Sequence, residues 1–281
     1  RIAAHPVLKV RRVYADVETT RDRDIYGAKA GGADVWPVYG GDSFDLWTPD
    51  SGTYYALAEG AAALGRVQRK RAGSPTGSPY AAMPRRWRDD PRTHPCLRPR
   101  VAIRNVTNRT NRRTLIAALI PANAILVETA PWLLWLDPQR PAAQEAFLLG
   151  VLSSLVADWW MRRFVETHVE EAAFNALPVP AVDAATGLAA RAVALAGRLA
   201  APDERFAEWA AAVGVAHGPL DPEAKQAMIE ELDAVVARLY GLSPEQLTHI
   251  FDTFHEWPRA EERIAWAARR DRTVALLRAL G

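Results

Sequence analysis

The sequence is poor in the residues that build disulfide-linked or metal-held scaffolds. It contains a single cysteine, Cys96, in 281 residues, which excludes an internal disulfide and a thiolate metal cluster. Its six histidines are dispersed, so we expect no metal site. No apolar run approaches the roughly 20 residues of a membrane-spanning helix, and no signal peptide is visible. These absences favour a protein of the reducing cytoplasm, with no membrane as partner.

The chain also lacks the motifs of nucleotide chemistry. It has no P-loop, no glycine-rich cofactor turn and no Asn/Asp-Pro-Pro-aromatic motif, which methyl transfer to a base would require. Residues 221–225 carry the letters of a nuclease motif, but Asp221 before Pro222 is better explained as a helix cap. No Ser-His-acid set stands out locally. We therefore predict no catalytic residue in this chain.

What the chain does have is positive charge concentrated in its middle. The formal net charge is only +2. Residues 66–113 hold 13 Arg and one Lys against two Asp, a balance of 14 − 2 = +12. From Asp183 to the end, 11 basic residues face 15 acidic ones, a balance of −4. Such asymmetry indicates a polyanionic partner for the middle of the chain.

The basic middle ends in a predicted hairpin. Residues 101–106 and 115–120 are apolar, strand-like runs, and the segment between them is rich in Thr, Asn and Arg, which favours a turn. Guanidinium and Asn amide groups are what proteins use on phosphates and base edges. We predict DNA contacts from Arg104, Asn105, Asn108, Arg109, Asn111, Arg112 and Arg113. For Arg104 and Arg113, a structural pairing within the β-rich part is an equally good explanation.

Two further basic clusters precede the hairpin. Residues 66–71 carry Arg and Lys at spacings that suit one helix face, although a solvated face or a disordered arm fits as well. The cluster at residues 85–88 surrounds Trp87, which either stacks on nucleic acid or fixes the loop to the core. We predict phosphate contacts from Lys70, Arg71, Arg85, Arg86 and Arg88.

The order of elements predicts an α+β fold. Strand-like runs occur at residues 7–14 and 35–39, where Pro37 argues for an edge strand, and a helix is expected over residues 54–65. Residues 98–136 read as a small β-rich part. Helical periodicity and cap residues then predict helices over residues 142–164, 184–199, 204–213, 222–240, 243–254 and 261–280. We predict a β-rich DNA target-recognition domain over residues 1–137 and a helical region over residues 138–281.

Seven short segments resemble, in order, the C-terminal half of large bacterial adenine-specific DNA methyltransferases. These include the type IIG fused enzymes and the methylases of DISARM- and BREX-like phage-defence systems. The segments are Trp36-Pro-Val-Tyr39-Gly-Gly41, Val101-Ala-Ile-Arg104-Asn105-Val106, Asn111-Arg-Arg-Thr114-Leu-Ile-Ala-Ala-Leu-Ile-Pro121, Gly150-Val-Leu-Ser-Ser154-Leu-Val-Ala-Asp158-Trp159, Phe174-Asn-Ala-Leu-Pro178-Val-Pro180, Val236-Ala-Arg-Leu-Tyr240-Gly241-Leu242 and Phe251-Asp-Thr-Phe254. Each is short, and the resemblance depends on their order across residues 35–280.

In that family this half reads the target site, while the adenine is flipped into the catalytic half. The resemblance implies recognition of double-stranded DNA for a restriction–modification or phage-defence enzyme that methylates adenine N6. It also implies a DNA contact at Tyr39, whereas Asp42 stands where the family often has Lys, so a phosphate contact is not expected there.

Because the sequence starts at Arg1 rather than Met, we expect that a catalytic domain precedes it. The resemblance implies S-adenosylmethionine as the cofactor of that domain, and we expect no cofactor in the present segment. The alternative is a stand-alone DNA specificity or scaffold subunit whose helices bind a separate catalytic protein. An upstream cofactor turn in the full gene would favour the first interpretation.

Overall fold

The computed structural model describes residues 1–281 except 7, 33, 137–141, 182, 185, 186 and 255–258. The described part mixes short strands with helices, which confirms the α+β class. It divides into a β-rich unit, Ile2–Val106 with Ile116–Arg140, and a helical unit, Arg1 with Thr107–Leu115 and Pro141–Gly281. The predicted boundary between residues 137 and 138 lies outside the described residues and stays a prediction.

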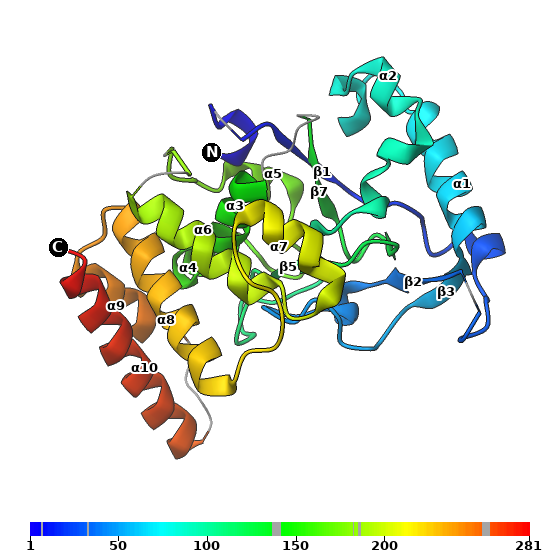
Figure 1. The fold of residues 1–281 in the computed structure, drawn as a ribbon. Helices are drawn as coiled ribbons and strands as arrows, with labels where there is room; N and C mark the ends of the chain where they lie inside the picture. The colour runs from blue at the N-terminus through cyan, green and yellow to red at the C-terminus, as the bar shows by residue number, and fades with distance from the viewer. Residues whose placement is uncertain (7, 33, 137–141, 182, 185–186, 255–258) are drawn as a thin grey trace. The chain divides into compact units, whose positions relative to one another are not determined.

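The β-rich unit contains two small sheets (Figure 1). The first has the strand order β1 (Val10–Val13), β7 (Trp132–Trp135), β4 (Arg100–Ile103) and β5 (Ala117–Ile120), with every neighbouring pair antiparallel. The second has the order β3 (Ala56–Glu59), β2 (Val35–Tyr39) and β6 (Ile125–Leu126). The predicted hairpin arms do pair, because Arg100 lies opposite Ile120 and Ile103 opposite Ala117. The described part of this unit also has short 3-10 helices before and between the strands: Ile2–Ala4, Arg23–Ile25, Gly41–Ser43, Pro79–Ala82, Pro91–Thr93 and Pro95–Leu97.

Strand β2 corrects the prediction made from Pro37. The strand is central rather than at an edge, since it pairs antiparallel with β3 and parallel with β6. Strand β6 pairs only with Val38 and Tyr39. Pro37 therefore lies just before the paired stretch on that side, where a missing backbone N–H leaves no ladder bond unmade.

Helix α1 (Gly60–Ala72) begins later than predicted. The first part of the expected helix is strand β3, in which Ala58 lies opposite Trp36. The turn from strand to helix requires glycine at position 60, because a Cβ there would lie 2.2 Å from Asp34 Oδ1. Residues 66–71 lie within α1, so the helical interpretation of this basic cluster is confirmed. The cluster at residues 85–88 forms the single-turn helix α2 (Arg85–Arg88).

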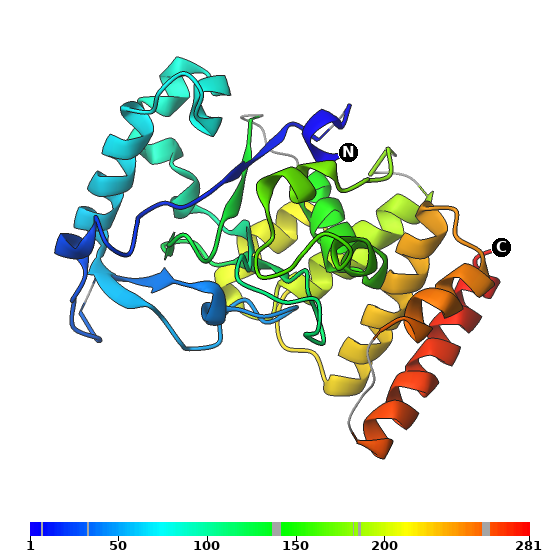
Figure 2. The same cartoon turned by 180° about the vertical axis from the view of Figure 1, so that it is seen from behind.

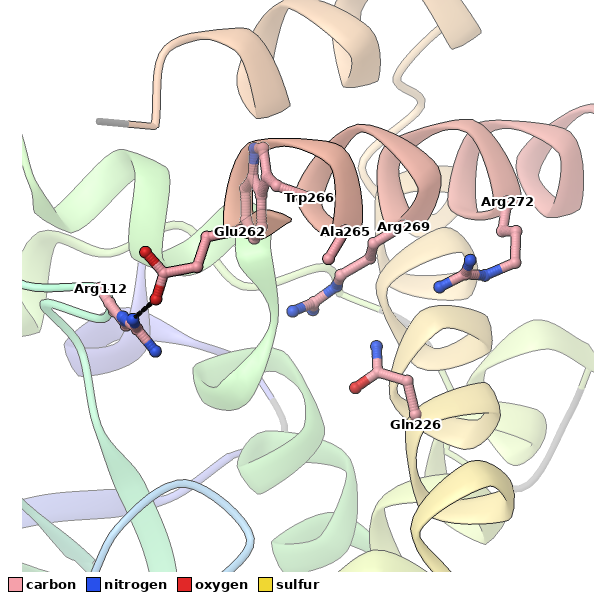
Figure 3. A pocket seen from close by; sticks show the side chains of 7 residues that line it. All are labelled: Arg112, Gln226, Glu262, Ala265, Trp266, Arg269 and Arg272. Atoms are coloured by element: carbon pink, nitrogen blue, oxygen red, sulfur yellow. Dashed lines mark hydrogen bonds and ion pairs between the residues drawn. The ribbon is translucent and has the colours of Figure 1, made fainter. Parts of the chain in front are cut away.

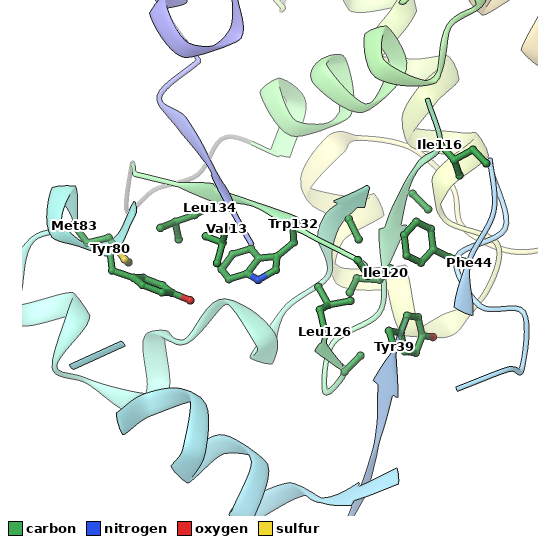
Figure 4. Close-up of a cluster of buried hydrophobic side chains, with 14 residues drawn as sticks. Val13, Tyr39, Phe44, Tyr80, Met83, Ile116, Ile120, Leu126, Trp132 and Leu134 are labelled. Carbon is green, nitrogen blue, oxygen red and sulfur yellow. The ribbon is translucent and has the colours of Figure 1, made fainter. Parts of the chain in front are cut away.

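The core of the β-rich unit contains a buried ion pair beside a hydrophobic cluster, and Figure 4 shows the side chains of the cluster. The cluster gathers side chains from both sheets around the fully buried Trp132. The Arg100 guanidinium lies 4.4 Å from the centre of that indole ring. It forms a two-pronged ion pair with Asp16, which is 0% exposed as a side chain. Asp16 also accepts the Leu126 N–H, and Arg100 donates to the Ala124 carbonyl, both at 3.0 Å. One charged pair thus joins β4 to the start of β6.

The helical unit is built from eight α-helices in its described part. They are α3 (Ala142–Ser153), α4 (Leu155–Met161), α5 (Glu171–Ala176), α6 (Gly187–Ala200), α7 (Ala207–Val213), α8 (Pro222–Leu239), α9 (Pro244–Asp252) and α10 (Ala260–Ala279), with a 3-10 turn at Glu204–Phe206. Helix α6 packs on α3 and α8, and α10 lies along α8 and α9, as Figures 1 and 2 show from opposite sides. The predicted caps are confirmed: Asp221 accepts the N–H groups of Glu223 and Ala224, and Ser243 caps α9. Pro258, expected to stop α9, lies outside the described residues.

The helix predicted over residues 142–164 is broken into α3 and α4. Ser154 has an extended backbone, with ψ of 156°, and its hydroxyl oxygen accepts the Ala157 N–H at 3.2 Å. The Leu155 N–H donates to Asp233 of α8 at 2.7 Å. These two acceptors satisfy backbone donors at the start of α4. The apolar spacing continues across the break, which is why periodicity alone did not reveal it.

The buried pair between Arg100 and Asp16 generates a stability prediction. Changing Arg100→Met leaves a carboxylate buried without its cation, and we expect the free energy of unfolding to fall by about 3–5 kcal/mol. The double variant Arg100→Met/Asp16→Asn should recover part of this loss, since a neutral amide still accepts the Leu126 N–H. Urea denaturation measures both. A loss below about 1 kcal/mol, the value typical of exposed ion pairs, would contradict the assigned role.

Candidate nucleic-acid interface

The loop between β4 and β5 belongs to the helical unit. Residues 107–114 were predicted as the tip of a hairpin, and contacts within the structure place residues 107–115 with the helices. Asp158 of α4 accepts the Thr114 N–H at 2.8 Å and the Leu115 N–H at 2.6 Å. Asp158 has no exposed surface, so these bonds form in a dry environment where each is strong. At the other end of the loop, the Thr107 N–H donates to the Thr167 carbonyl at 3.0 Å.

Two arginines complete the anchor around Asp158. Arg113 lies 3.5 Å and Arg162 lies 3.4 Å from the Asp158 carboxylate. Arg113 also donates to the carbonyls of Ser153 and Ser154, at 2.6 and 3.0 Å. Of the two explanations given for Arg113, DNA contact and structural pairing, the structure supports the pairing. The partner, Asp158, lies in the helical unit rather than in the β-rich part.

Arg162 binds the backbone of the loop through hydrogen bonds to its carbonyl groups. It donates to the carbonyls of Arg109, at 3.1 Å, and Arg112, at 2.8 Å, and also to that of Asn111. Its guanidinium lies 4.2 Å from the centre of the Phe254 ring. Burial lowers the pKa of Arg162 below its ordinary value, and Asp158 opposes that shift. The loop backbone is thus fixed by one buried acid and two guanidinium groups.

The tip of the loop presents polar side chains to solvent. Asn108, Arg109, Asn111 and Arg112 are all exposed. Asn108 turns the chain by accepting the Thr110 N–H at 2.9 Å. Asn111 makes a long hydrogen bond of 3.4 Å to the Thr107 hydroxyl, and Arg112 forms an ion pair with Glu262 of α10. Four of the predicted contacts are therefore brought together on one ordered turn.

The end of α4 adds an aromatic and basic patch that the sequence analysis missed. The rings of Trp160 and Phe164 are in tilted contact, with their centres 4.5 Å apart, and the Phe164 residue is 54% exposed. The exposed Arg163 places its guanidinium 3.9 Å from the Trp159 ring. Trp159 and Trp160 were interpreted only as part of a buried helix face. The signal available in the sequence was the closeness of two Trp, two Arg and one Phe within residues 159–164, since aromatic and basic side chains together are used for stacking on nucleic acid.

Two predicted contacts of the β-rich unit are interior residues. Tyr39 is fully buried, with its ring stacked on Tyr54 at 5.4 Å. Arg71 is also fully buried, and it donates to Gln68, to the Asp90 carbonyl at 2.6 Å and to Thr93. These positions correct the expectation of surface contact. Tyr39 packs the core, and Arg71 fixes the turn that follows α2, because spacing on a helix does not say which face is buried.

Arg104 and Asn105 also have structural roles. Arg104 donates to the Gly41 carbonyl at 2.8 Å and to the Phe44 carbonyl. The Asn105 side-chain oxygen accepts from Arg12 at 2.8 Å. For Arg104 the structural alternative is again the one supported. The Trp36-to-Gly41 segment of the family resemblance is thereby fixed to the strand that precedes the loop.

The remaining predicted phosphate contacts differ in exposure. Lys70 forms an ion pair of 2.6 Å with Asp22. Arg85 is 86% exposed and lies 3.3 Å from Asp89, and Arg88 lies 3.8 Å from the same carboxylate. Arg86 is exposed. DNA contact by these four residues stays a prediction.

Carboxylates from elsewhere in the chain neutralise much of the basic middle. Most basic residues between positions 66 and 113 face an acidic partner in space. The partners from outside that segment are Asp16, Asp22, Asp24, Asp45, Asp158 and Glu262. Within the described residues, Arg69, Arg86 and Arg98 are exposed and form no ion pair. The balance of +12 therefore overstates the positive surface.

A buried His–Cys pair has the residue types of a nucleophilic site, but its thiol is not activated. His94 Nδ1 lies 3.0 Å from Cys96 Sγ and accepts the Cys96 N–H. Burial raises the pKa of the thiol to about 12 and holds the pKa of His94 well below its ordinary value. The thiol therefore stays protonated and unreactive at neutral pH.

The described residues contain neither a metal site nor a membrane-spanning helix. No group of three His, Cys, Asp or Glu side chains in that part of the chain is arranged to hold a metal ion. None of its helices combines the length and the apolar character needed to cross a membrane.

Comparison with known proteins gives one similarity. No protein-family model matches the chain, and no curated protein matches it significantly. Among solved structures, the chain is similar to the Type IIL restriction-modification enzyme MmeI in complex with DNA, with a TM-score of 0.37 and 15% identity. The similarity covers 86% of this chain and 31% of that enzyme. Similarity at this level does not establish a shared fold or function.

The anchor of the loop generates a second stability prediction. Asp158→Asn keeps an oxygen for the backbone donors but removes the charge that faces Arg113 and Arg162. We expect the free energy of unfolding to fall by about 3–5 kcal/mol, because buried cations lose their partner. The control is Asp252→Asn, which breaks an ion pair with Arg270 at a carboxylate that is 52% exposed and should change stability by about 1 kcal/mol or less. If urea denaturation gives the same loss of unfolding free energy for both variants, Asp158 does not anchor the loop.

Proposed function

We propose that this chain reads DNA for a site-specific adenine-N6 methyltransferase of a restriction–modification or phage-defence system. The observation that carries the proposal is a loop whose backbone is fixed while its polar side chains are exposed. Asp158 and Arg162 hold the backbone, and Asn108, Arg109 and Asn111 face solvent. The ordered resemblance of the sequence to the target-recognition half of such enzymes supports the same role.

The exposed side chains suit direct readout of base edges. Arg pairs bidentately with guanine and Asn with adenine in the major groove, and each such pair discriminates by about 1–3 kcal/mol. A loop that is ordered before binding loses less conformational entropy on the duplex. Arg109 and Asn111 are our candidates for base contact, since the oxygen of Asn108 is used within its own turn.

The patch at the end of α4 suits the DNA backbone. Arg163 is exposed and basic, and Phe164 offers an open ring face beside Trp160. A guanidinium group neutralises phosphate, and exposed rings stack on unpaired bases. In the β-rich unit, Arg86 is an exposed candidate for a further phosphate contact. These contacts would supply affinity that depends on salt rather than on sequence.

In this proposal the methyl transfer itself belongs to a catalytic domain of the same protein or to a separate catalytic subunit. The sequence holds none of the motifs that S-adenosylmethionine and adenine would need. The cofactor and the flipped adenine are therefore assigned to that catalytic part. The place of action is the cytoplasm, where the target DNA of a bacterium lies.

The proposal is tested by titrating the chain with duplex DNA of mixed sequence at several salt concentrations. For Arg109→Ala and Arg163→Ala, loss of a phosphate contact should make the slope of log K against log salt shallower by about 0.9 per residue. Loss of a base contact at Arg109 should instead weaken binding of a preferred sequence about 5- to 150-fold.

The matched control is Arg238→Ala, which removes an exposed arginine from α8 of the same unit. We expect its affinity and salt slope to equal those of the unchanged chain. Equal behaviour of all three variants and the unchanged chain would show that neither the loop nor the α4 patch touches DNA.

A further inference from the structure

A pocket in the helical unit brings three arginines to one cavity of about 330 Å³ (Figure 3). Its wall is formed by Arg112, Gln226, Glu262, Ala265, Trp266, Arg269 and Arg272. The residues come from the loop, from α8 and from α10. The volume lies at the lower end of the range of small-ligand sites, roughly 300–1,000 Å³, which suits a ligand no larger than a mononucleotide.

Carboxylates behind the wall hold two of the arginines in place. Arg272 donates from Nε and Nη2 to Glu230, at 2.8 and 2.6 Å. Arg269 donates from Nη2 to Asp233 at 2.7 Å. Both acids are buried, so the guanidinium groups are positioned before any ligand arrives.

The arginines keep donors that these bonds do not use. A guanidinium carries five N–H donors and no acceptor. Arg269 Nε is buried and has no hydrogen-bond partner among the described residues. Figure 3 shows the Arg269 side chain reaching from α10 into the space between Glu262 and Gln226. The hydrogen-bonding capacity of the Arg269 guanidinium is therefore only partly used by Asp233.

We propose that this pocket binds a phosphate group. Arg269 and Arg272 keep the donors of Nη1 beside those bonds to Asp233 and Glu230, and guanidinium donors pair with phosphate oxygens. Arg112 adds a third guanidinium from the loop. The Gln226 amide donates to Glu230 at 2.8 Å, which leaves its oxygen as an acceptor for an amino or hydroxyl group of the same ligand. The phosphate belongs either to a free mononucleotide or to the DNA backbone.

Glu262 places a negative charge in the wall of the pocket. It is the one carboxylate among the lining residues, and it forms ion pairs with Arg112 and Arg259. The hydrogen bond from Arg259 lowers the pKa of Glu262 below its ordinary value, so its charge is present at neutral pH. An entering anion must compete with this carboxylate for Arg112.

The test is isothermal titration of the full chain with inorganic phosphate, with adenosine monophosphate and with adenosine as the phosphate-free probe. Glu262→Gln should bind phosphate or the nucleotide about tenfold more tightly, because a repulsive charge is removed and glutamine keeps the helix cap. A misfolded chain cannot show this gain. Arg272→Ala and Arg269→Lys should weaken binding about tenfold.

Arg270→Ala is the control, since Arg270 lies on the same helix and pairs with Asp252 away from the pocket. It should leave binding unchanged. The titrations contain no DNA, so they can succeed or fail independently of DNA recognition by the loop. A separate titration with duplex DNA distinguishes the two sources of phosphate. If the small phosphate-bearing probes do not bind, but duplex DNA binds and Arg272→Ala weakens that binding while Arg270→Ala does not, the DNA backbone supplies the phosphate. If neither small probe binds saturably and Arg272→Ala leaves DNA binding unchanged, or if adenosine binds as well as its monophosphate, the proposal is overturned.

Discussion

The carboxylate of Asp158 is the interaction on which the exposed loop depends. It accepts two consecutive backbone N–H groups of the loop and faces two guanidinium groups, and the carboxylate itself has no access to water. A carboxylate in that position is stable only because its charge and its lone pairs are matched. The same match fixes the loop, so that Arg109 and Asn111 can remain exposed on an ordered backbone.

Charge along the sequence and charge in space lead to different conclusions about partners. The basic middle of the chain predicts a broad cationic surface, yet Asp16, Asp22 and Asp158 neutralise much of it locally. Several arginines there are structural groups that bridge backbone carbonyls. What remains for a polyanion is narrower: the loop, the patch at the end of α4 and a few exposed arginines of the β-rich unit.

The sequence was sufficient for what depends on local patterns. Two apolar runs on either side of a polar turn predicted the pairing of β4 with β5, and cap residues such as Asp221 located the helices of the C-terminal half. It was insufficient wherever a distant partner decides the outcome. Asp158 lies more than forty residues from the amides that it binds, and no spacing rule connects them. Tyr39 and Arg71 were misassigned to the surface for the same reason, because only tertiary packing shows that they are buried.

The central claim is that the loop is ordered in the free chain and contacts DNA through its exposed side chains. Hydrogen–deuterium exchange at the loop amides, with and without duplex DNA, tests it most directly. We expect the amides of Thr114 and Leu115 to exchange slowly in the free chain, and those of residues 108–112 to become slower when DNA is added. Fast exchange at Thr114 in the free chain, or unchanged exchange at residues 108–112 when the chain is saturated with DNA, would contradict the account.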